Sequence, residues 1–402
     1  MSNPFKKHWG LNPEIDFLNH GSFGATPTEV LNVQQDWIRQ LESDPIEFLA
    51  PERSLLPRLE LVRAKIAELV NAPPRDLALV RNATDGVNAV LRSFPFDSGD
   101  EVLVTNHGYN ACNNAVEYAA SRFGAKMVVA EIPFPIRSET EVLDAVAAKL
   151  TNRTRLVLID HVTSPTGLVM PVREVVGLCR DASVRVMIDG AHAPGMLPVD
   201  LGQIGADYYV GNHHKWLCAP KTSGFLYVAP EWQPEVRPTT ISHGANNDRM
   251  GATRFQAEFN WTGTFDPSPL LSVPAAIDFI GNLYPQTPNR TGLETLMINN
   301  RSLALAGRDV LMNRLNVGEP APSEMIGSLA TVPLPYGNRL SAADADSLRN
   351  RLFTDHRIEV PVVRLPDGQT CVRISAQAYN SLDQYERLGA AIKESLSAMV
   401  RK

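Results

Sequence analysis

The chain has 402 residues, 44% hydrophobic and 20% charged, which is enough apolar material for a large folded core and unlike a disordered protein. Its 38 basic and 44 acidic residues give a formal net charge of −6 without a dense Lys/Arg run, which argues against nucleic-acid and membrane-surface partners. The first 21 residues are broken by Gly, Pro, Asp and Glu, unlike a signal peptide, and no apolar stretch reaches membrane-spanning length. The four cysteines are widely spaced. We therefore expect a reduced, cytoplasmic protein.

Short β-rich runs alternate with helical patterns over the first two-thirds of the chain. The predicted strands are 77–80, 101–105, 126–132, 155–160, 184–189, 207–210 and 224–228. Helical patterns lie between them at 87–93, 111–123, 141–150 and 172–182. This alternation predicts an α/β domain with a mostly parallel seven-stranded sheet and helices on both faces. Ligands of such sheets bind outside the carboxyl ends of the strands.

The pattern changes after residue 265. A helix framed by prolines is predicted over 266–285, a long periodic helix over 291–315, and a Pro-rich turn at 319–325. A small α+β unit follows, with strands at 326–333, 359–363 and 370–374 and helices at 342–354 and 382–399. We predict a large domain over 21–270 and a small domain made of 1–20 and 271–402.

An acid and a lysine stand just after two of the predicted strands. Asp189 ends one strand, and Lys215 follows the next strand along the chain. A buried ion pair is one explanation. Another is a pyridine-ring cofactor, which needs a lysine for a Schiff base and a carboxylate for its ring nitrogen. The segment RNATDGVNAV, with Thr84 at a turn before a helix, would supply backbone N–H groups for the phosphate of such a cofactor.

Several segments together resemble a known family. NAT at 82–84, DGAHA at 189–193, HHKW at 213–216 and WTGT at 261–264 are similar to the class V aminotransferases, which are pyridoxal-phosphate (PLP) enzymes of fold type I. LNHGSFGATP at 18–27 and VRISAQAYNS at 372–381 resemble the isopenicillin N epimerase-like branch. The likeness covers nearly the whole chain and implies PLP as the cofactor and a large and a small domain.

The resemblance also implies roles for individual residues. Lys215 would be the catalytic Schiff-base lysine, and Asp189 would hold the pyridine nitrogen. Thr262 and Gly263 would reach the cofactor phosphate of a neighbouring subunit, which implies a homodimer. Phe265 stands where many epimerase relatives have an arginine, which weakens the case for a dicarboxylate substrate. The other residues implied at the cofactor are Ala83, Thr84, Tyr109, Thr163, His192, Asn212 and His214, with His161 an alternative to Thr163.

Arg373, in a late predicted strand, would bind the α-carboxylate of an amino-acid substrate, because a planar guanidinium can hold a carboxylate at two points. Asn19, His20 and Tyr379 are the further substrate-pocket candidates, which makes the pocket partly polar and partly aromatic. The stretch at 356–369 contains no cysteine, which disfavours persulfide-forming desulfuration. No residues are assigned to a metal.

Epimerisation of an amino acid or an amino-acid conjugate is the first expectation from this branch. A C–S β-lyase acting on a cysteine S-conjugate in sulfur-containing antibiotic metabolism, transamination and decarboxylation stay open. A scaffold without catalysis is disfavoured by the joint presence of Lys215, Asp189 and Arg373. A metal-binding hydrolase, or another metal-binding protein, is the alternative from another class; the ligand types suit zinc, although no H-E-x-x-H spacing is present. Its candidate ligands are Asp160, His161, Asp189, His192, His213 and His214.

Overall fold

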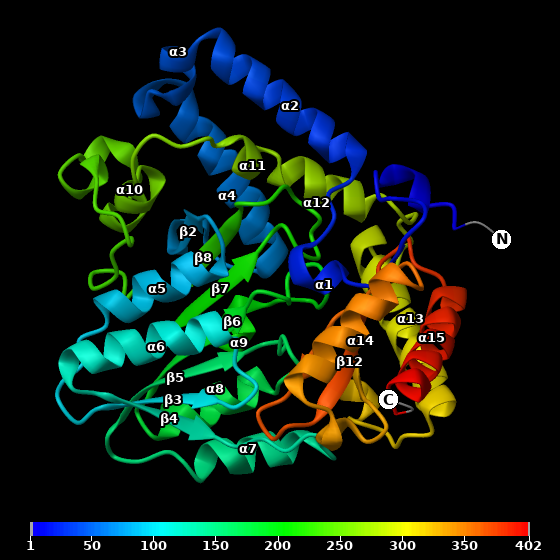
Figure 1. Ribbon diagram of the computed structural model, residues 1–402. Helices are drawn as coiled ribbons and strands as arrows, with labels where there is room; N and C mark the ends of the chain where they lie inside the picture. The colour runs from blue at the N-terminus through cyan, green and yellow to red at the C-terminus, as the bar shows by residue number, and fades with distance from the viewer. Residues whose placement is uncertain (1–2, 401–402) are drawn as a thin grey trace.

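The computed structural model describes residues 3–400 and is built around a seven-stranded sheet (Figure 1). The strands lie in the order β2-β8-β7-β6-β5-β3-β4, and β8 alone runs antiparallel to its neighbours. The predicted mostly parallel α/β sheet is therefore confirmed. The strand bounds are β2 Leu77–Val80, β3 Glu101–Thr105, β4 Lys126–Ala130, β5 Thr154–Asp160, β6 Arg185–Gly190, β7 Tyr208–Asn212 and β8 Gly224–Val228.

Helices cover both faces of this sheet, because its strands are apolar on both sides. In β3, Val102 and Val104 pack into the apolar cluster beneath α5 and α6, whereas Leu103 packs into the larger cluster on the opposite face. Figure 1 shows α5 and α6 side by side on one face. The helices that alternate with the strands are α5 Ala83–Ser93, α6 Asn110–Phe123, α7 Glu139–Ala147, α8 Val172–Asp181 and α9 Leu201–Ile204.

Several helices were not anticipated from the sequence. They are α1 His20–Phe23, α2 Thr28–Ser43, α3 Pro45–Leu49, α4 Leu56–Val70 and α10 Arg254–Asn260. The single helix expected over 266–285 is instead two, α11 Ser268–Leu271 and α12 Val273–Gly281. Pro274 lacks an N–H and fits only in a first turn, so a new helix begins there. Within residues 3–400, no helix combines the length and the apolar character that a bilayer crossing requires.

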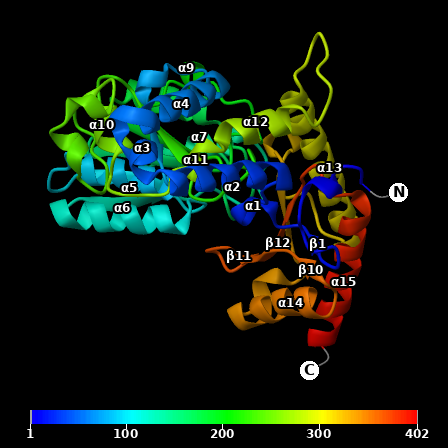
Figure 2. The ribbon, with the colours of Figure 1, turned by 90° about the horizontal axis from the view of Figure 1, so that it is seen from above.

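The C-terminal part is an α+β unit, seen beside the main sheet in Figure 2. A three-stranded antiparallel sheet has the order β11-β12-β9, and a short parallel pair joins β1 to β10. Since α11 and α12 contact α2 and α4, the proposed boundary at residue 270 stays a prediction. The bounds are β1 Asp16–Phe17, β9 Leu329–Pro333, β10 Ile358–Glu359, β11 Val362–Arg364, β12 Thr370–Ser375, α13 Gly292–Leu315, α14 Ala342–Thr354 and α15 Leu382–Val400.

The N-terminal segment lies between the two parts of the molecule. The N–H of Ser375 donates to the carbonyl of Leu18 at 3.0 Å, so this segment is attached to the end of β12. At Gly24, with φ at +71°, a Cβ would lie 1.9 Å from the carbonyl oxygen of His214. Only glycine allows this approach, which brings the N-terminal segment against the backbone just before Lys215.

Candidate active site

A pocket of about 230 Å³ lies at the carboxyl ends of β5, β6 and β7, where parallel α/β sheets bind their ligands. Residues from six separate stretches of the chain meet there. Its lining is Ser22, Phe23, Asn82, Ala83, Thr84, Tyr109, Asp160, Ser164, Asp189, Ala191, His192, Asn212, His214 and Lys215.

Lys215 follows β7 and points its amine at a histidine. Its Nζ lies 2.9 Å from Nε2 of His192, which follows β6. Burial lowers the pKa of Lys215 from 10.5 to about 8; the negative charge of Asp189 opposes that shift, and the positive charge of Arg373 adds to it. The lysine is therefore poised to exchange a proton near neutral pH.

Two carboxyl groups stand side by side at the strand ends. Asp160 on β5 and Asp189 on β6 are opposite each other in the parallel register. Asp189 accepts hydrogen bonds from the N–H of Ala191 at 2.9 Å and from the thiol of Cys112 at 3.1 Å. Burial and the neighbouring Asp189 raise the pKa of Asp160 well above its usual value. A buried carboxylate in this position suits the protonated ring nitrogen of a pyridine cofactor.

The N-terminus of α5 opens onto the same pocket. Asn82 caps this eleven-residue helix by accepting the N–H of Asp85, and Thr84 and His214 also line the pocket. Backbone N–H groups at a helix start suit an anion such as a phosphate. The N–H of Ala83 is already bonded to Oδ1 of Asn212 at 2.8 Å. The expected contacts of these two residues with phosphate would therefore have to replace or share that bond.

Arg373 lies on β12 beside two serines of the pocket. Its terminal nitrogens donate to the carbonyl of Ser164 at 2.5 Å and to the hydroxyl of Ser22 at 2.9 Å. Its Nε is buried and has no partner among the described residues. Burial lowers the pKa of Arg373 to about 10, which leaves the guanidinium charged at neutral pH. A buried guanidinium with a spare donor is suited to a carboxylate.

None of the four expected substrate residues is part of the pocket lining: Arg373 contacts two of the lining serines, and the other three lie behind the pocket. His20 accepts the hydroxyl of Tyr379 at 2.7 Å and donates to the carbonyl of Lys215 at 3.0 Å, so this pair supports the lysine backbone. Asn19 binds Glu359 and accepts the hydroxyl of Ser22 at 2.5 Å. It therefore acts on the pocket through its neighbour.

Thr163 is also outside the lining. Its hydroxyl lies 2.7 Å from that of Thr166 and accepts the N–H of Leu168, which holds the turn after β5. The neighbouring Ser164 faces the pocket. Sequence reasoning missed Ser164, which follows the candidate Thr163, and Ser22, which lies in the segment 18–27 that resembles the epimerase-like branch.

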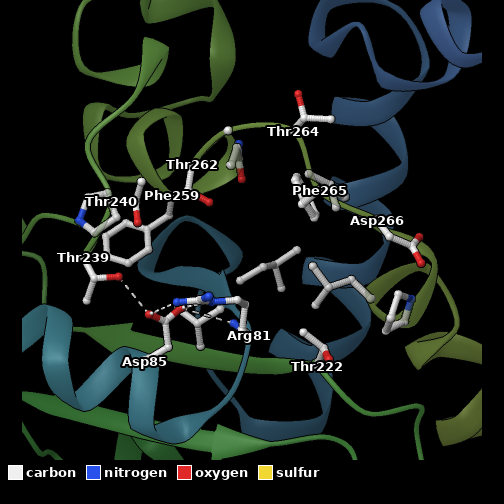
Figure 3. A pocket seen from close by; sticks show the side chains of 18 residues that line it. Arg81, Asp85, Thr222, Thr239, Thr240, Phe259, Thr262, Thr264, Phe265 and Asp266 are labelled. Carbon is white, nitrogen blue, oxygen red and sulfur yellow. Dashed lines mark hydrogen bonds and ion pairs between the residues drawn. The ribbon is translucent and has the colours of Figure 1, made fainter.

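Thr262 and Gly263 line a different cavity, of about 350 Å³, together with Phe265 (Figure 3). Arg81 and Asp85, which pair with each other, lie on its wall. Residues 82–84 line the first pocket, so the two cavities lie against the same turn of the chain. Within one subunit, the segment 262–265 does not reach Lys215's pocket.

The residues of the hydrolase alternative do not converge on a point. His161 binds the hydroxyl of Tyr209 at 2.9 Å, and His213 stacks on Phe225. Across residues 3–400, no three His, Cys, Asp or Glu side chains are grouped as metal ligands. The structure gives the metal reading no support.

A mostly parallel sheet whose strand ends present a lysine, a carboxylate and an anion-binding helix start defines a PLP-dependent enzyme of fold type I. The groups present fit that cofactor: an amine for the aldehyde carbon, a carboxylate for the protonated ring nitrogen and N–H groups for the phosphate. The chain belongs to the class V aminotransferase family, because the model of that family, Aminotransferase class-V, matches residues 24–295.

An epimerase and a desulfhydrase are similar to this chain to the same degree, and a lyase is similar to a lesser degree. Isopenicillin N epimerase of Streptomyces clavuligerus is 33% identical over 95% of this chain and 95% of its own length. L-cysteine desulfhydrase of Arabidopsis thaliana is 33% identical over 94% of this chain and 87% of its own. Hercynylcysteine sulfoxide lyase of Schizosaccharomyces pombe is 28% identical over 82% of this chain and 83% of its own.

Solved structures support the fold. The cystine C-S lyase C-DES, in complex with cysteine persulfide, superposes with a TM-score of 0.76 at 22% identity, over 94% of this chain and 97% of that one. A cysteine desulfurase from Thermococcus onnurineus has a TM-score of 0.76 at 19% identity, over 99% of both chains. At these identities the likeness establishes the architecture and leaves the reaction open.

Proposed function

We propose that this PLP enzyme is a C–S β-lyase that removes the α-proton of a small cysteine-type amino acid with Lys215. The observation that carries this proposal is the Lys215–His192 pair, 2.9 Å apart, in a pocket of only about 230 Å³. That volume is below the roughly 300–1,000 Å³ of typical ligand pockets. With a cofactor inside, it favours a small substrate, and a large one would have to extend past Phe23 and Tyr109.

The proposed cofactor contacts follow from the lining. Lys215 would hold the aldehyde carbon, Asp189 the ring nitrogen, and Thr84 and His214 the phosphate at the start of α5. Bound there, PLP supplies an electron sink for the negative charge that develops at Cα. Tyr109, at the mouth, would pack against the ring.

The chain's own residues would then divide the work. Arg373 binds the substrate carboxylate beside Ser22 and Ser164, which orients the Cα–H bond. The freed amine of Lys215 takes the α-proton, and the resulting ammonium protonates the departing sulfur. The C–S bond breaks with its electron pair on sulfur, and water converts the remaining carbon skeleton to pyruvate and ammonia. The relatives named desulfhydrases and lyases support this outcome.

Epimerisation, the first expectation from the sequence, is the second candidate. Lys215 follows β7 and Tyr109 follows β3, and these strands flank β6 and β5 in the sheet order. The two side chains therefore enter the pocket from different strands, and epimerisation would require them to face opposite sides of Cα. The similarity to isopenicillin N epimerase also supports this candidate.

We also propose a homodimer in which Thr262 and Gly263 reach the partner's pocket, in keeping with their place on a separate cavity. Phe23 is 74% exposed at the pocket mouth, which a partner subunit would cover. Residence in the cytoplasm stays a prediction.

Proton NMR in heavy water, with the cofactor-loaded enzyme and L-cysteine, L-cystine or an S-alkylcysteine, tests the proposal. Pyruvate and a thiol or persulfide are expected. Exchange of the α-proton with accumulation of both enantiomers and no pyruvate would overturn elimination in favour of epimerisation. Tyr109→Phe separates the two further, because it should abolish epimerisation and spare most of an elimination.

A further inference from the structure

Trp216, the residue after the catalytic lysine, is hydrogen-bonded to the same histidine as the lysine. Its indole N–H donates to Nδ1 of His192 at 3.3 Å, while Nε2 of that ring lies 2.9 Å from Nζ of Lys215. Trp216 is fully buried and His192 is 2% exposed. The consecutive side chains of Lys215 and Trp216 therefore contact the two different nitrogens of the buried His192 ring.

The chemistry of these groups sets the direction of both bonds. An indole nitrogen can only donate, so Nδ1 of His192 accepts. Burial holds the pKa of His192 well below its usual value, and the positive charge of Arg373 adds to this effect, so the ring is neutral. A neutral imidazole with an accepting Nδ1 carries its proton on Nε2. That Nε2–H must donate to Lys215, and only an unprotonated amine can accept it.

We infer that Trp216 is a positioning residue that fixes His192 as its Nε2–H tautomer and thereby presents Lys215 as an unprotonated amine. Without the indole donor, the imidazole could move its proton to Nδ1. Nε2 would then accept a hydrogen bond from the lysine ammonium and stabilise the protonated form.

The charges around Lys215 explain why the tautomer of His192 can change the protonation of the lysine. Asp189, Asp160 and Cys112 favour the protonated lysine, whereas burial and Arg373 oppose it. On the side of the histidine, His214 and His20 add to the charges that keep it neutral. The effects on the protonation of Lys215 thus oppose one another, and a change of tautomer at its hydrogen-bond partner His192 can shift the balance between ammonium and amine.

The surroundings hold the indole in place. The Trp216 ring lies 5.0 Å from that of His20, which binds the carbonyl of Lys215. A Cβ at Gly195 would lie 2.6 Å from the carbonyl of Trp216, so the chain packs closely on this side too. A phenyl ring can keep most of this packing while it removes the N–H.

The test uses Trp216→Phe, with Trp37→Phe as the matched control, because Trp37 also donates one indole hydrogen bond, to the carbonyl of Leu271. Histidine-selective ¹⁵N NMR of wild type, assigned with His192→Asn, should show the Nε2–H tautomer with and without cofactor. A wild-type ring protonated on Nδ1 overturns the inference even if the variant fails to fold.

The second readout is the pH dependence with which an amine-selective reagent labels Lys215 in the cofactor-free protein. Trp216→Phe should raise the pKa of Lys215 by about one unit, a tenfold change in the ratio of ammonium to amine. The control should leave it unchanged. An unchanged lysine pKa in a folded Trp216→Phe protein overturns the inference.

The inference rests on the proposed function only for its kinetic consequence, an equal shift of the acid limb of kcat, because Lys215 is a free amine only once the substrate is bound. A shifted lysine pKa without turnover of any sulfur substrate would leave the inference standing and refute the lyase. The two failures can therefore be told apart.

Discussion

The surroundings of Lys215 and the segment from Thr262 to Phe265 differ in how complete they are within one subunit. Around Lys215, each side of the pocket is built from its own chain, and His192, Trp216 and His20 support the lysine directly or through one intermediate. The segment at 262–265 is partly exposed on a separate cavity. In the proposed homodimer, the target of this segment lies in the other subunit.

This difference indicates which functions depend on assembly. The proposed proton transfer at Lys215 and carboxylate binding at Arg373 would use contacts within one chain. A partner subunit would add contacts to the cofactor through Thr262 and Gly263 and would cover the entrance of the pocket. Substitutions around Lys215 should therefore have the same effect whatever the partner subunit carries. The effect of a substitution in the segment 262–265 should appear in the partner's site.

The largest effect is expected for Lys215→Ala, which should lower turnover by on the order of 10³-fold or more, because the proton acceptor is lost. The visible absorption of the bound cofactor should change while circular dichroism stays the same. Lys221→Ala is the control, since that lysine binds Thr26 outside the pocket. Full activity of the Lys215 variant would refute the assignment.

Arg373→Lys should raise KM by about 10- to 100-fold and change kcat less, because an ammonium cannot reproduce the two-point grip of a guanidinium. Steady-state kinetics with L-cysteine measures both constants. Arg364→Lys, on the neighbouring strand β11 and exposed, should leave them unchanged. An equal loss in both variants would argue for a structural role.

Thr262→Ala should weaken cofactor binding by about tenfold through the loss of one hydrogen bond to a charged group. Mixing it with Lys215→Ala sharpens the comparison between the two regions. A hybrid dimer has one site with a native lysine and a native partner threonine, so tight binding and activity should return in part. Mixtures that show no recovery would contradict the shared site.

His213→Phe is expected to have the smallest effect, on stability alone. Both ring nitrogens of His213 are buried without partners among the described residues, and burial lowers its pKa to about 3. Below about pH 6.5 the unfolded chain binds a proton at His213, whereas the folded chain binds it only near pH 3. The free energy of unfolding therefore falls as the pH is lowered from 6.5 towards 3.

His213→Phe should remove up to one proton from that dependence and raise stability at pH 7 by about 1 kcal/mol. Urea unfolding between pH 4 and 7 measures both changes. The exposed His243→Phe serves as the control. An undiminished pH slope in the His213 variant would show that other groups carry it.

Much of the large domain could be predicted because its strands are short apolar runs and its chemistry follows strand ends, as at Asp189 and Lys215. The break before Pro274 was missed because the apolar period continues through it. The positions of His20 and Tyr379 behind the lysine could not be read from local patterns, since they are 359 residues apart and meet only through tertiary packing. Whether Ser164 or the neighbouring Thr163 faces the pocket depends on the geometry of the turn after β5, which local sequence patterns do not reveal.

The contacts between residues 3–21 and residues 375–378 have a consequence for the order in which the protein folds during synthesis. Asn3 donates to the carbonyl of Ala378 at 2.7 Å, Gly21 to the hydroxyl of Ser375 at 3.0 Å, and Leu18 accepts from the same residue. Residues 3–21 therefore leave the ribosome long before β12 and can settle against Lys215 only after that strand has emerged. The main sheet can assemble during translation, but the catalytic pocket is completed only after β12 has emerged.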